Sequence, residues 1–257
     1  MITIKKDNEI ELLRQGGKIL ARILKQLLDE VKSGISTGHL EQMADFLIRQ
    51  AGGWPAFKGF KSDKNDQPYP TVLCASINNE VVHAPSLPSR QLKSGDIVGI
   101  DIGLEYENFY TDMAATVAVG KVSREAQKLI RATKEALVLG IKEVRPGNSL
   151  NNIGKVIEQY AKANNFSVVR DLAGHGVGYA VHEDPQIPNY DLADNKKIIL
   201  KPGMVLAIEP MVNVGGWRVK DGPDKFTVLT ADGGLSAHFE HTVLVTERGH
   251  EILTKFE

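Results

Sequence analysis

The chain has 257 residues, of which 42% are hydrophobic, enough to bury a sizeable core in one large domain or two small ones. Its 31 basic and 32 acidic residues give a formal net charge of −1, so the sequence lacks the basic excess of a dedicated nucleic-acid binder. Cys74 is the only cysteine, which excludes an intrachain disulfide and a cluster of thiolate metal ligands and fits a reducing compartment.

The N-terminal sequence MITIKKDNEIELL carries charges where a signal peptide needs its apolar segment. No run of the sequence approaches the roughly 18 apolar residues of a membrane-spanning helix. We therefore expect a soluble, cytoplasmic protein that does not contact a membrane. No linker, low-complexity tract or internal repeat marks a domain boundary, so we expect one domain over residues 1–257.

Helical spacing of apolar residues predicts four helices, over residues 8–31, from residue 37 to the glycine pair at 52–53, and over 123–144 and 149–165. Asp7 is the expected N-cap of the first of these helices.

Four stretches combine β-branched residues with alternation and predict strands: DIVGIDIG (96–103), YTDMAATVAV (110–119), MVLAIEPMVNV (204–214) and HFEHTVLVT (238–246). Three polar stretches predict surface loops, over residues 61–70, 183–197 and 220–225. Strands that arrive in pairs between helices favour an α+β fold with a mainly antiparallel sheet.

Two aspartates, Asp101 and Asp112, interrupt stretches that otherwise predict buried strands. A hairpin of strands 96–103 and 108–119 that turns near residues 106–107 would set them opposite one another, with Cβ atoms about 4.5–5.5 Å apart. Two like charges at that distance repel unless a divalent cation lies between them. The alternative is a different register, in which one or both carboxylates reach solvent.

Glu209 and Glu240 repeat this pattern, since each is a carboxylate in a hydrophobic predicted strand. No lysine or arginine stands beside these acids in their strands, so a shared metal is the simplest neutralising partner. His175 lies between glycines in GHGVG (174–178), where little side-chain bulk blocks its imidazole.

Other site chemistries fit the sequence less well. GHGVG lacks the Lys-Ser/Thr pair of a P-loop and the third glycine of a dinucleotide site. The sequence HEDPQ (182–186) is not a zinc-binding H-E-x-x-H helix, because it ends in Gln186 and contains Pro185. There is no G-x-S-x-G sequence, and Cys74 in TVLCAS is typical of an inert buried thiol, so we expect water to be the nucleophile.

The motifs GIDIG, YTDMAAT, GHGVG, IEPM and FEHT occur in this order between residues 69 and 246, and together they resemble those of the type I methionine aminopeptidases. The resemblance implies the pita-bread fold, a pseudo-twofold α+β arrangement around two divalent metal ions. It implies that Asp101 binds one metal through both oxygens. Asp112 and Glu240 would bridge the two metals, and His175 and Glu209 would complete the other site.

The same resemblance assigns catalytic roles. Glu209 would also accept the proton of the water that two metal ions activate for attack on a peptide carbonyl. His182 would polarise the scissile carbonyl and stabilise the oxyanion, and His83 would contact the substrate backbone and assist proton movement. Four histidines have no match in the family and are expected to be structural or exposed: His39, His238, His241 and His250.

A methionine side chain requires an adaptable apolar pocket. By family position, Tyr69, Cys74 and Phe226 would line it, with Val181 nearby, although for any single one of them core packing is the simpler interpretation. The sequence departs from the bacterial pattern at Val181, at Phe226 and at Ala84 after His83. Residues 61–67 also resemble a loop insertion.

The predicted function is metal-dependent removal of the initiator methionine from nascent chains and peptides with a small second residue. Four carboxylates and one imidazole suit Mn²⁺, Fe²⁺, Co²⁺ or Zn²⁺. We expect a monomer with transient contact to the ribosome and no specific nucleic-acid partner.

Two other classes stay open. An Xaa-Pro peptidase or creatinase-like enzyme would share the fold, but such enzymes carry a large N-terminal domain, and only 100 residues precede Asp101. A non-catalytic binding relative would be expected to have lost metal ligands. A type II methionine aminopeptidase is disfavoured, because the 31-residue step from Glu209 to Glu240 leaves no room for its helical insertion. We also expect no N-terminal zinc-finger extension.

Overall fold

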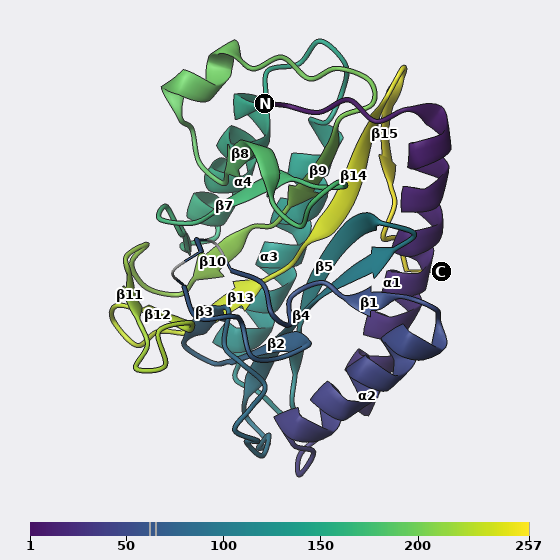
Figure 1. Ribbon diagram of the computed structural model, residues 1–257. Coiled ribbons are helices and arrows are strands. Elements are labelled where there is room, and N and C mark those ends of the chain that lie inside the picture. Colours follow the sequence, from purple (N-terminus) through teal and green to yellow (C-terminus); the bar gives the residue numbers. More distant parts are fainter. Residues whose placement is uncertain (62, 65, 257) are drawn as a thin grey trace.

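A computed structural model describes residues 1–61, 63–64 and 66–256 (Figure 1). Its helices are α1 (Asp7–Glu30), α2 (Thr37–Gln50), α3 (Arg124–Lys142), α4 (Asn151–Ala163) and the short 3-10 helix η1 (Ala193–Lys197). Its strands are β1 (Trp54–Pro55), β2 (Leu73–Ile77), β3 (Glu80–Val82), β4 (Ile97–Tyr106), β5 (Phe109–Ala118), β6 (Ser167–Val168), β7 (Ala173–Gly176), β8 (Glu183–Pro188), β9 (Val205–Ile208), β10 (Met211–Asn213), β11 (Val219–Asp221), β12 (Val228–Thr230), β13 (Ser236–His238), β14 (His241–Thr246) and β15 (Gly249–Ile252).

The four predicted helices form close to their expected bounds. The predicted N-cap of α1 is wrong: Lys6 takes that place and Asp7 already lies in the helix. The backbone N–H of Lys6 donates to Oε2 of Glu9 at 2.7 Å. Glu9, in the first turn of the helix, thus satisfies the N–H of the N-cap residue itself. Ser36 and Ser123 cap α2 and α3, and each side chain accepts from a backbone N–H of the first turn.

The strand pairs between these elements are antiparallel throughout the described residues. Strands β1, β2 and β5 all pair with β4, and β15-β14-β9-β7-β8 form a second sheet. Two small sheets have the orders β13-β10-β6 and β11-β12-β3. The predicted α+β class with a mainly antiparallel sheet is confirmed.

One hydrophobic core joins both large sheets to the helices. It contains buried residues from α1, β4, α3, α4 and β14, among them Leu24, Ile100, Leu137, Ile153 and Val243. Figure 1 shows α1 and α2 to the right of the strands, with α3 and α4 farther back. In the part of the chain that the structure describes, no helix combines the length and the apolar character needed to cross a membrane.

The β4–β5 hairpin turns one residue later than predicted. Glu107 and Asn108 form the turn, with φ of 51° and 64°, the left-handed conformation that two-residue hairpin turns require. Asp101 therefore pairs with Ala114, and Gly103 pairs with Asp112. The predicted direct pairing of the aspartates is wrong, but the shift keeps both on one face as diagonal neighbours, and they are only 8% and 4% exposed.

The two predicted strands that contain glutamates are each interrupted at the glutamate. Residues 204–214 divide into β9 and β10 at Glu209 and Pro210, where the proline has no N–H for a ladder. Residues 238–246 divide at Phe239 and Glu240. Because β9 pairs with β14 and β10 with β13, both glutamates lie where the chain passes from one sheet to another.

The predicted loop at 183–197 is wrong, because it contains β8 and η1. Its prolines are compatible with a strand since β8 is the edge of its sheet. The predicted loop at 220–225 overlaps the end of β11. Residues 61–70 contain no helix or strand where they are described, while residues 62 and 65 lie outside the described residues.

Candidate metal centre and substrate pocket

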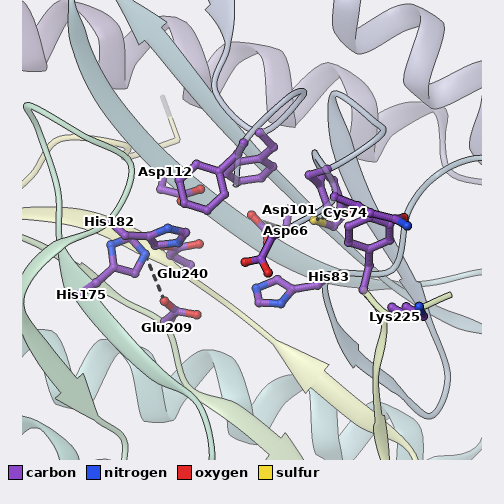
Figure 2. Close-up of a pocket in the computed structure, with 15 residues that line it drawn as sticks. Asp66, Cys74, His83, Asp101, Asp112, His175, His182, Glu209, Lys225 and Glu240 are labelled. Atoms are coloured by element: carbon purple, nitrogen blue, oxygen red, sulfur yellow. Dashed lines mark hydrogen bonds and ion pairs between the residues drawn. The ribbon is translucent and has the colours of Figure 1, made fainter. Parts of the chain in front are cut away.

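A cavity of about 550 Å³ opens between the sheets, and all of the predicted site residues lie on its wall (Figure 2). It is lined by Phe57, Phe60, Asp66, Gln67, Tyr69, Cys74, His83, Asp101, Asp112, His175, His182, Glu209, Lys225, Phe226 and Glu240. The cavity thus brings together acids and histidines that are widely separated in the sequence.

Strand β5 is joined to the segment that leads into β14 by a row of hydrogen bonds, here called the β5–β14 seam. The backbone N–H of Asp112 donates to Oγ1 of Thr242 at 2.9 Å, and that hydroxyl donates to the carbonyl of Asp112 at 2.8 Å. The N–H of Glu240 donates to the carbonyl of Ala114 at 2.9 Å. The seam fixes the backbones of Asp112 and Glu240 side by side.

The glycines around His175 serve close packing of β7 between its neighbours. A Cβ atom at Gly174 would lie 2.4 Å from the carbonyl oxygen of Ala207 in β9. At Gly176 it would lie 2.2 Å from the carbonyl oxygen of Asp184 in β8. The sequence interpretation, that the glycines leave the imidazole open, therefore misses their main physical reason.

One ring nitrogen of His175 is committed to the backbone. Its Nδ1 lies 2.9 Å from the carbonyl oxygen of Gly176, which can only accept, so Nδ1 carries the proton. The lone pair on Nε2 then faces Oε1 of Glu209 at 3.4 Å, shown as the dashed line in Figure 2. The Nδ1 contact fixes the tautomer and the ring orientation that leave Nε2 able to bind a metal ion.

The carboxylates of the cavity resist ionisation together. Burial, with the charge of Asp112, raises the pKa of Asp101 well above its ordinary value. Burial raises the pKa of Asp112 to about 7. Burial and neighbouring carboxylates likewise raise the pKa of Glu209 and of Glu240. Ionising these acids at neutral pH therefore requires a positive charge among them.

The residues present fit divalent cations as that charge. Asp112, His175 and Glu240 each offer a ligand atom, and these atoms lie within 4.8 Å of one another. Oδ1 of Asp101 and Oε1 of Glu240 are buried without a hydrogen-bond partner. Among the described residues of the wall, the one lysine or arginine is Lys225, which Figure 2 shows on the opposite side from His175.

Comparisons with known proteins agree with this geometry. Residues 11–247 match metallopeptidase family M24. The chain is 48% identical to a methionine aminopeptidase of Clostridium perfringens over 255 residues, 99% of each protein. This chain belongs to the methionine aminopeptidases of family M24. The resemblance found in the sequence motifs is confirmed.

Solved structures extend the likeness to the fold. A methionine aminopeptidase of Thermotoga maritima is 41% identical and superposes with a TM-score of 0.94, covering 99% of this chain and 100% of that one. A prolidase of Pyrococcus furiosus, 24% identical, shares the fold at a TM-score of 0.75, and the match covers 99% of this chain but 66% of the prolidase. The pita-bread fold is confirmed.

His83 and His182 face the cavity of this methionine aminopeptidase and are both solvent-exposed. His83 has a φ of 59°, which is uncommon for a residue with a side chain and tends to occur at functional sites. Although each ring keeps an open edge, desolvation by the walls lowers the pKa of both. Both are thus neutral at neutral pH and able to donate one N–H.

Aromatic residues line the cavity together with Cys74. The Tyr69 hydroxyl donates to Sγ at 3.1 Å, and the Tyr69 ring meets Phe226 and Phe57 edge-on, with centroids 5.5 and 6.5 Å away. Phe60 packs edge-on against His182 at 4.9 Å.

Two of these aromatic residues were missed in the sequence. Nothing in the local pattern distinguishes Phe57 and Phe60 from core aromatics. Conversely, Val181, which was expected near this pocket, is 5% exposed and does not line the cavity, and Ala84 is buried at 1%.

His238 is a further residue of the site that sequence reasoning set aside. It is 3% exposed, and its Nε2 lies 3.4 Å from Oε2 of Glu209. A signal existed, because His238 stands two residues before Glu240 and alternate residues of an extended chain share a face. The expectation of a structural or exposed role did not include this contact.

Proposed function

We propose that this chain is a methionyl aminopeptidase that removes the N-terminal methionine from peptides and nascent chains with a small second residue. The observation that carries the proposal is that Asp101, Asp112, Glu209 and Glu240 meet His175 in one cavity, where Lys225 is the one lysine or arginine among the described residues of the wall. Burying four carboxylates that repel one another lowers stability unless cations are bound among them, so the cluster points to a metal centre.

In this proposal Asp101, Asp112, His175, Glu209 and Glu240 hold two divalent metal ions. The donor set of carboxylates and one imidazole suits Mn²⁺, Fe²⁺, Co²⁺ or Zn²⁺. When bound, such ions lower the pKa of water and polarise a peptide carbonyl.

The protein's own groups then handle orientation and protons. Glu209 accepts the proton of the attacking water and passes it to the leaving amine, a role suited to a carboxylate with a raised pKa. His182 donates its N–H to the carbonyl oxygen as negative charge develops there. His83 contacts the substrate backbone from the same wall of the cavity.

The aromatic residues around Cys74 are proposed to hold the methionine side chain. A flexible thioether packs well against aromatic edges, and Tyr69, Phe226 and Phe57 present such edges next to the Asp101 side of the cavity. We propose that the whole chain forms one catalytic domain, active as a monomer and in transient contact with the ribosome.

The test compares hydrolysis of Met-Gly-x, Leu-Gly-x and x-Pro peptides by the metal-loaded chain. Selective release of methionine is expected. Proline-directed cleavage would favour the Xaa-Pro alternative, and no cleavage of any peptide would favour a binding protein.

Glu209→Gln examines the mechanism in the same assay. We expect kcat to fall by about 10²–10⁴-fold, because the amide cannot accept the proton. Glu247→Gln, at an exposed position, is the matched control and should keep wild-type rates. Near-normal turnover by Glu209→Gln, with the fold intact by circular dichroism, would remove Glu209 from the mechanism.

A further inference from the structure

The N-terminal segment, residues 1–6, packs against the part of the chain that carries His182. The backbone N–H of Lys5 donates to the carbonyl of Gly203 at 2.8 Å, and the amino group of Met1 pairs with Asp184. Figure 1 likewise shows the N-terminus close to β8. A segment outside the catalytic motifs thus contacts β8, the strand that begins directly after His182.

Lys5 is buried in this contact and forms an ion pair there. Its Nζ lies 2.7 Å from Oε2 of Glu183, and the two side chains are 0% and 8% exposed. A lysine is almost never fully buried unless it is paired. Burial lowers the pKa of Lys5. Burial works to raise the pKa of Glu183, but hydrogen bonds from Lys5 and Thr3 leave it below its ordinary value.

The same carboxylate of Glu183 holds the turn between β7 and β8. Its Oε1 accepts from the backbone N–H of Tyr179 and, at 3.1 Å, from that of Ala180. Its Oε2 accepts from Lys5 and from the hydroxyl of Thr3. One side chain therefore ties the N-terminal segment to the turn.

Lys5 also shapes the turn by contact. Its Cε would lie 2.3 Å from a Cβ atom at Gly178, whose φ is 140°, so the lysine passes directly over the turn backbone. Its Nζ lies 4.5 Å from the ring centroid of Tyr179, whose hydroxyl donates to Oε2 of Glu9 at 2.7 Å. The turn is thereby held to α1 as well.

His182 stands between this turn and Glu183. Its ring meets Phe60 and His175 edge-on, with centroids at 4.9 and 4.4 Å. These contacts locate the ring. The backbone that carries it is held on both sides, because Glu183 follows His182 directly and accepts from the N–H groups of Tyr179 and Ala180 before it, while pairing with Lys5.

We propose that the buried Lys5–Glu183 ion pair positions His182, so that the N-terminal segment is a functional support of the active site. The inference rests on the proposed function, in which His182 donates to the substrate carbonyl. Lys5 and Glu183 are positioning residues, since neither lines the cavity among the described residues.

The test uses the full chain loaded with Mn²⁺ and compares Lys5→Met with Arg14→Met. Arg14 of α1 is the control, because its ion pair with Glu251, at 2.8 and 2.9 Å, joins the same N-terminal part of the chain to a residue away from the cavity. For Lys5→Met we expect kcat on a Met-Ala-x peptide to fall about tenfold or more, with KM changed less than about twofold. Arg14→Met should lower stability without lowering kcat.

The double variant Lys5→Met/Glu183→Gln supplies the rescue. A glutamine oxygen can still accept from Tyr179 and Ala180, and no unpaired charge remains buried, so kcat should rise above that of Lys5→Met. Thr3→Val, which removes one hydrogen bond to Glu183, is a milder variant to use if Lys5→Met does not fold.

Hydrogen exchange of residues 177–183 gives a readout that does not need turnover. Lys5→Met should speed exchange there, and Arg14→Met should not. Unchanged exchange, or a kcat unchanged by Lys5→Met or Thr3→Val, would overturn the proposal. If the wild-type chain releases no methionine, the proposed function fails, while the exchange experiment still decides whether the pair holds the turn.

Discussion

At the scale of single residues, the site places buried carboxyl groups close enough to repel one another when they ionise. Asp101 keeps a buried oxygen without a partner, and its pKa is raised by burial and by Asp112. Uncompensated burial of this kind lowers the stability of a metal-free protein, and bound cations relieve it. The proposed metal ligands are therefore residues that the fold alone would not favour.

Asp101→Asn should accordingly stabilise the metal-free protein. We expect its free energy of unfolding to rise by about 1 kcal/mol or more, because an amide avoids the cost of burying a carboxyl group that its surroundings keep from ionising. Metal content measured by elemental analysis should fall. The measurement is urea unfolding in the presence of a chelator.

Asp96→Asn is the control for this change. Asp96 precedes the same strand, and its oxygens accept from Asn78 and from the N–H of Lys93, both at 2.8 Å. Its loss should destabilise the protein. Equal destabilisation by both variants would contradict the account of stored repulsion.

At the scale of elements, the wall of the cavity depends on side chains that do not themselves line it. Glu41 of α2 is 6% exposed and accepts from the N–H groups of Val72 and Leu73 at 2.8 and 3.2 Å. It also accepts from the hydroxyl of Ser86 at 2.7 Å. One helix side chain thus fixes both the start of β2, which carries Cys74, and the segment that follows His83.

Glu41→Gln should cost about 1–3 kcal/mol of unfolding free energy, because its amide group leaves a buried donor facing another donor. Asp45→Asn on the same helix removes only a surface ion pair to Arg49 and should cost less than about 1 kcal/mol. Urea unfolding followed by circular dichroism compares the two. A loss no greater in Glu41→Gln than in Asp45→Asn would show that this carboxylate does not hold β2.

At the scale of the whole molecule, metal binding and folding are linked. The proposed ligands come from the β4–β5 hairpin, from β7 and from the breaks after β9 and β13, so a cation bound among them joins the sheets. Ligand binding to the folded state alone stabilises it by mass action.

The pH dependence of stability should therefore reverse with metal. Acids whose folded pKa is raised, such as Asp112 at about 7, stabilise the protein at low pH and lose that contribution as pH rises through the folded pKa. We expect the Tm of the metal-free protein to fall between about pH 5.5 and 8. With saturating Mn²⁺ it should rise over the same range, because protons compete for the ligands.

Thermal unfolding at fixed ionic strength measures both profiles. Glu247→Gln, which changes an exposed acid, should leave both slopes as in the wild type. A metal-free Tm that rises steadily over this range would contradict the raised pKa values of the cavity.

The sequence predicted the helices well, because apolar spacing is a local signal, whereas the one predicted cap, Asp7, was wrong. It predicted the strand pairs less well. The hairpin register followed from the left-handed pair Glu107 and Asn108, one residue beyond the expected turn. The β8 strand was missed because its prolines indicate a loop unless the strand is known to be an edge.

The sequence by itself determined the chemistry of the site. Carboxylates in apolar stretches contradict local folding preferences, and this contradiction is visible in the sequence alone. What only the tertiary structure decided is the geometry, namely the β5–β14 seam, the contact of His238 with Glu209 and the support of the His182 turn by Lys5. These depend on hydrogen bonds and ion pairs between residues that are distant along the chain. No local pattern encodes such pairings, because each partner alone is compatible with many surroundings.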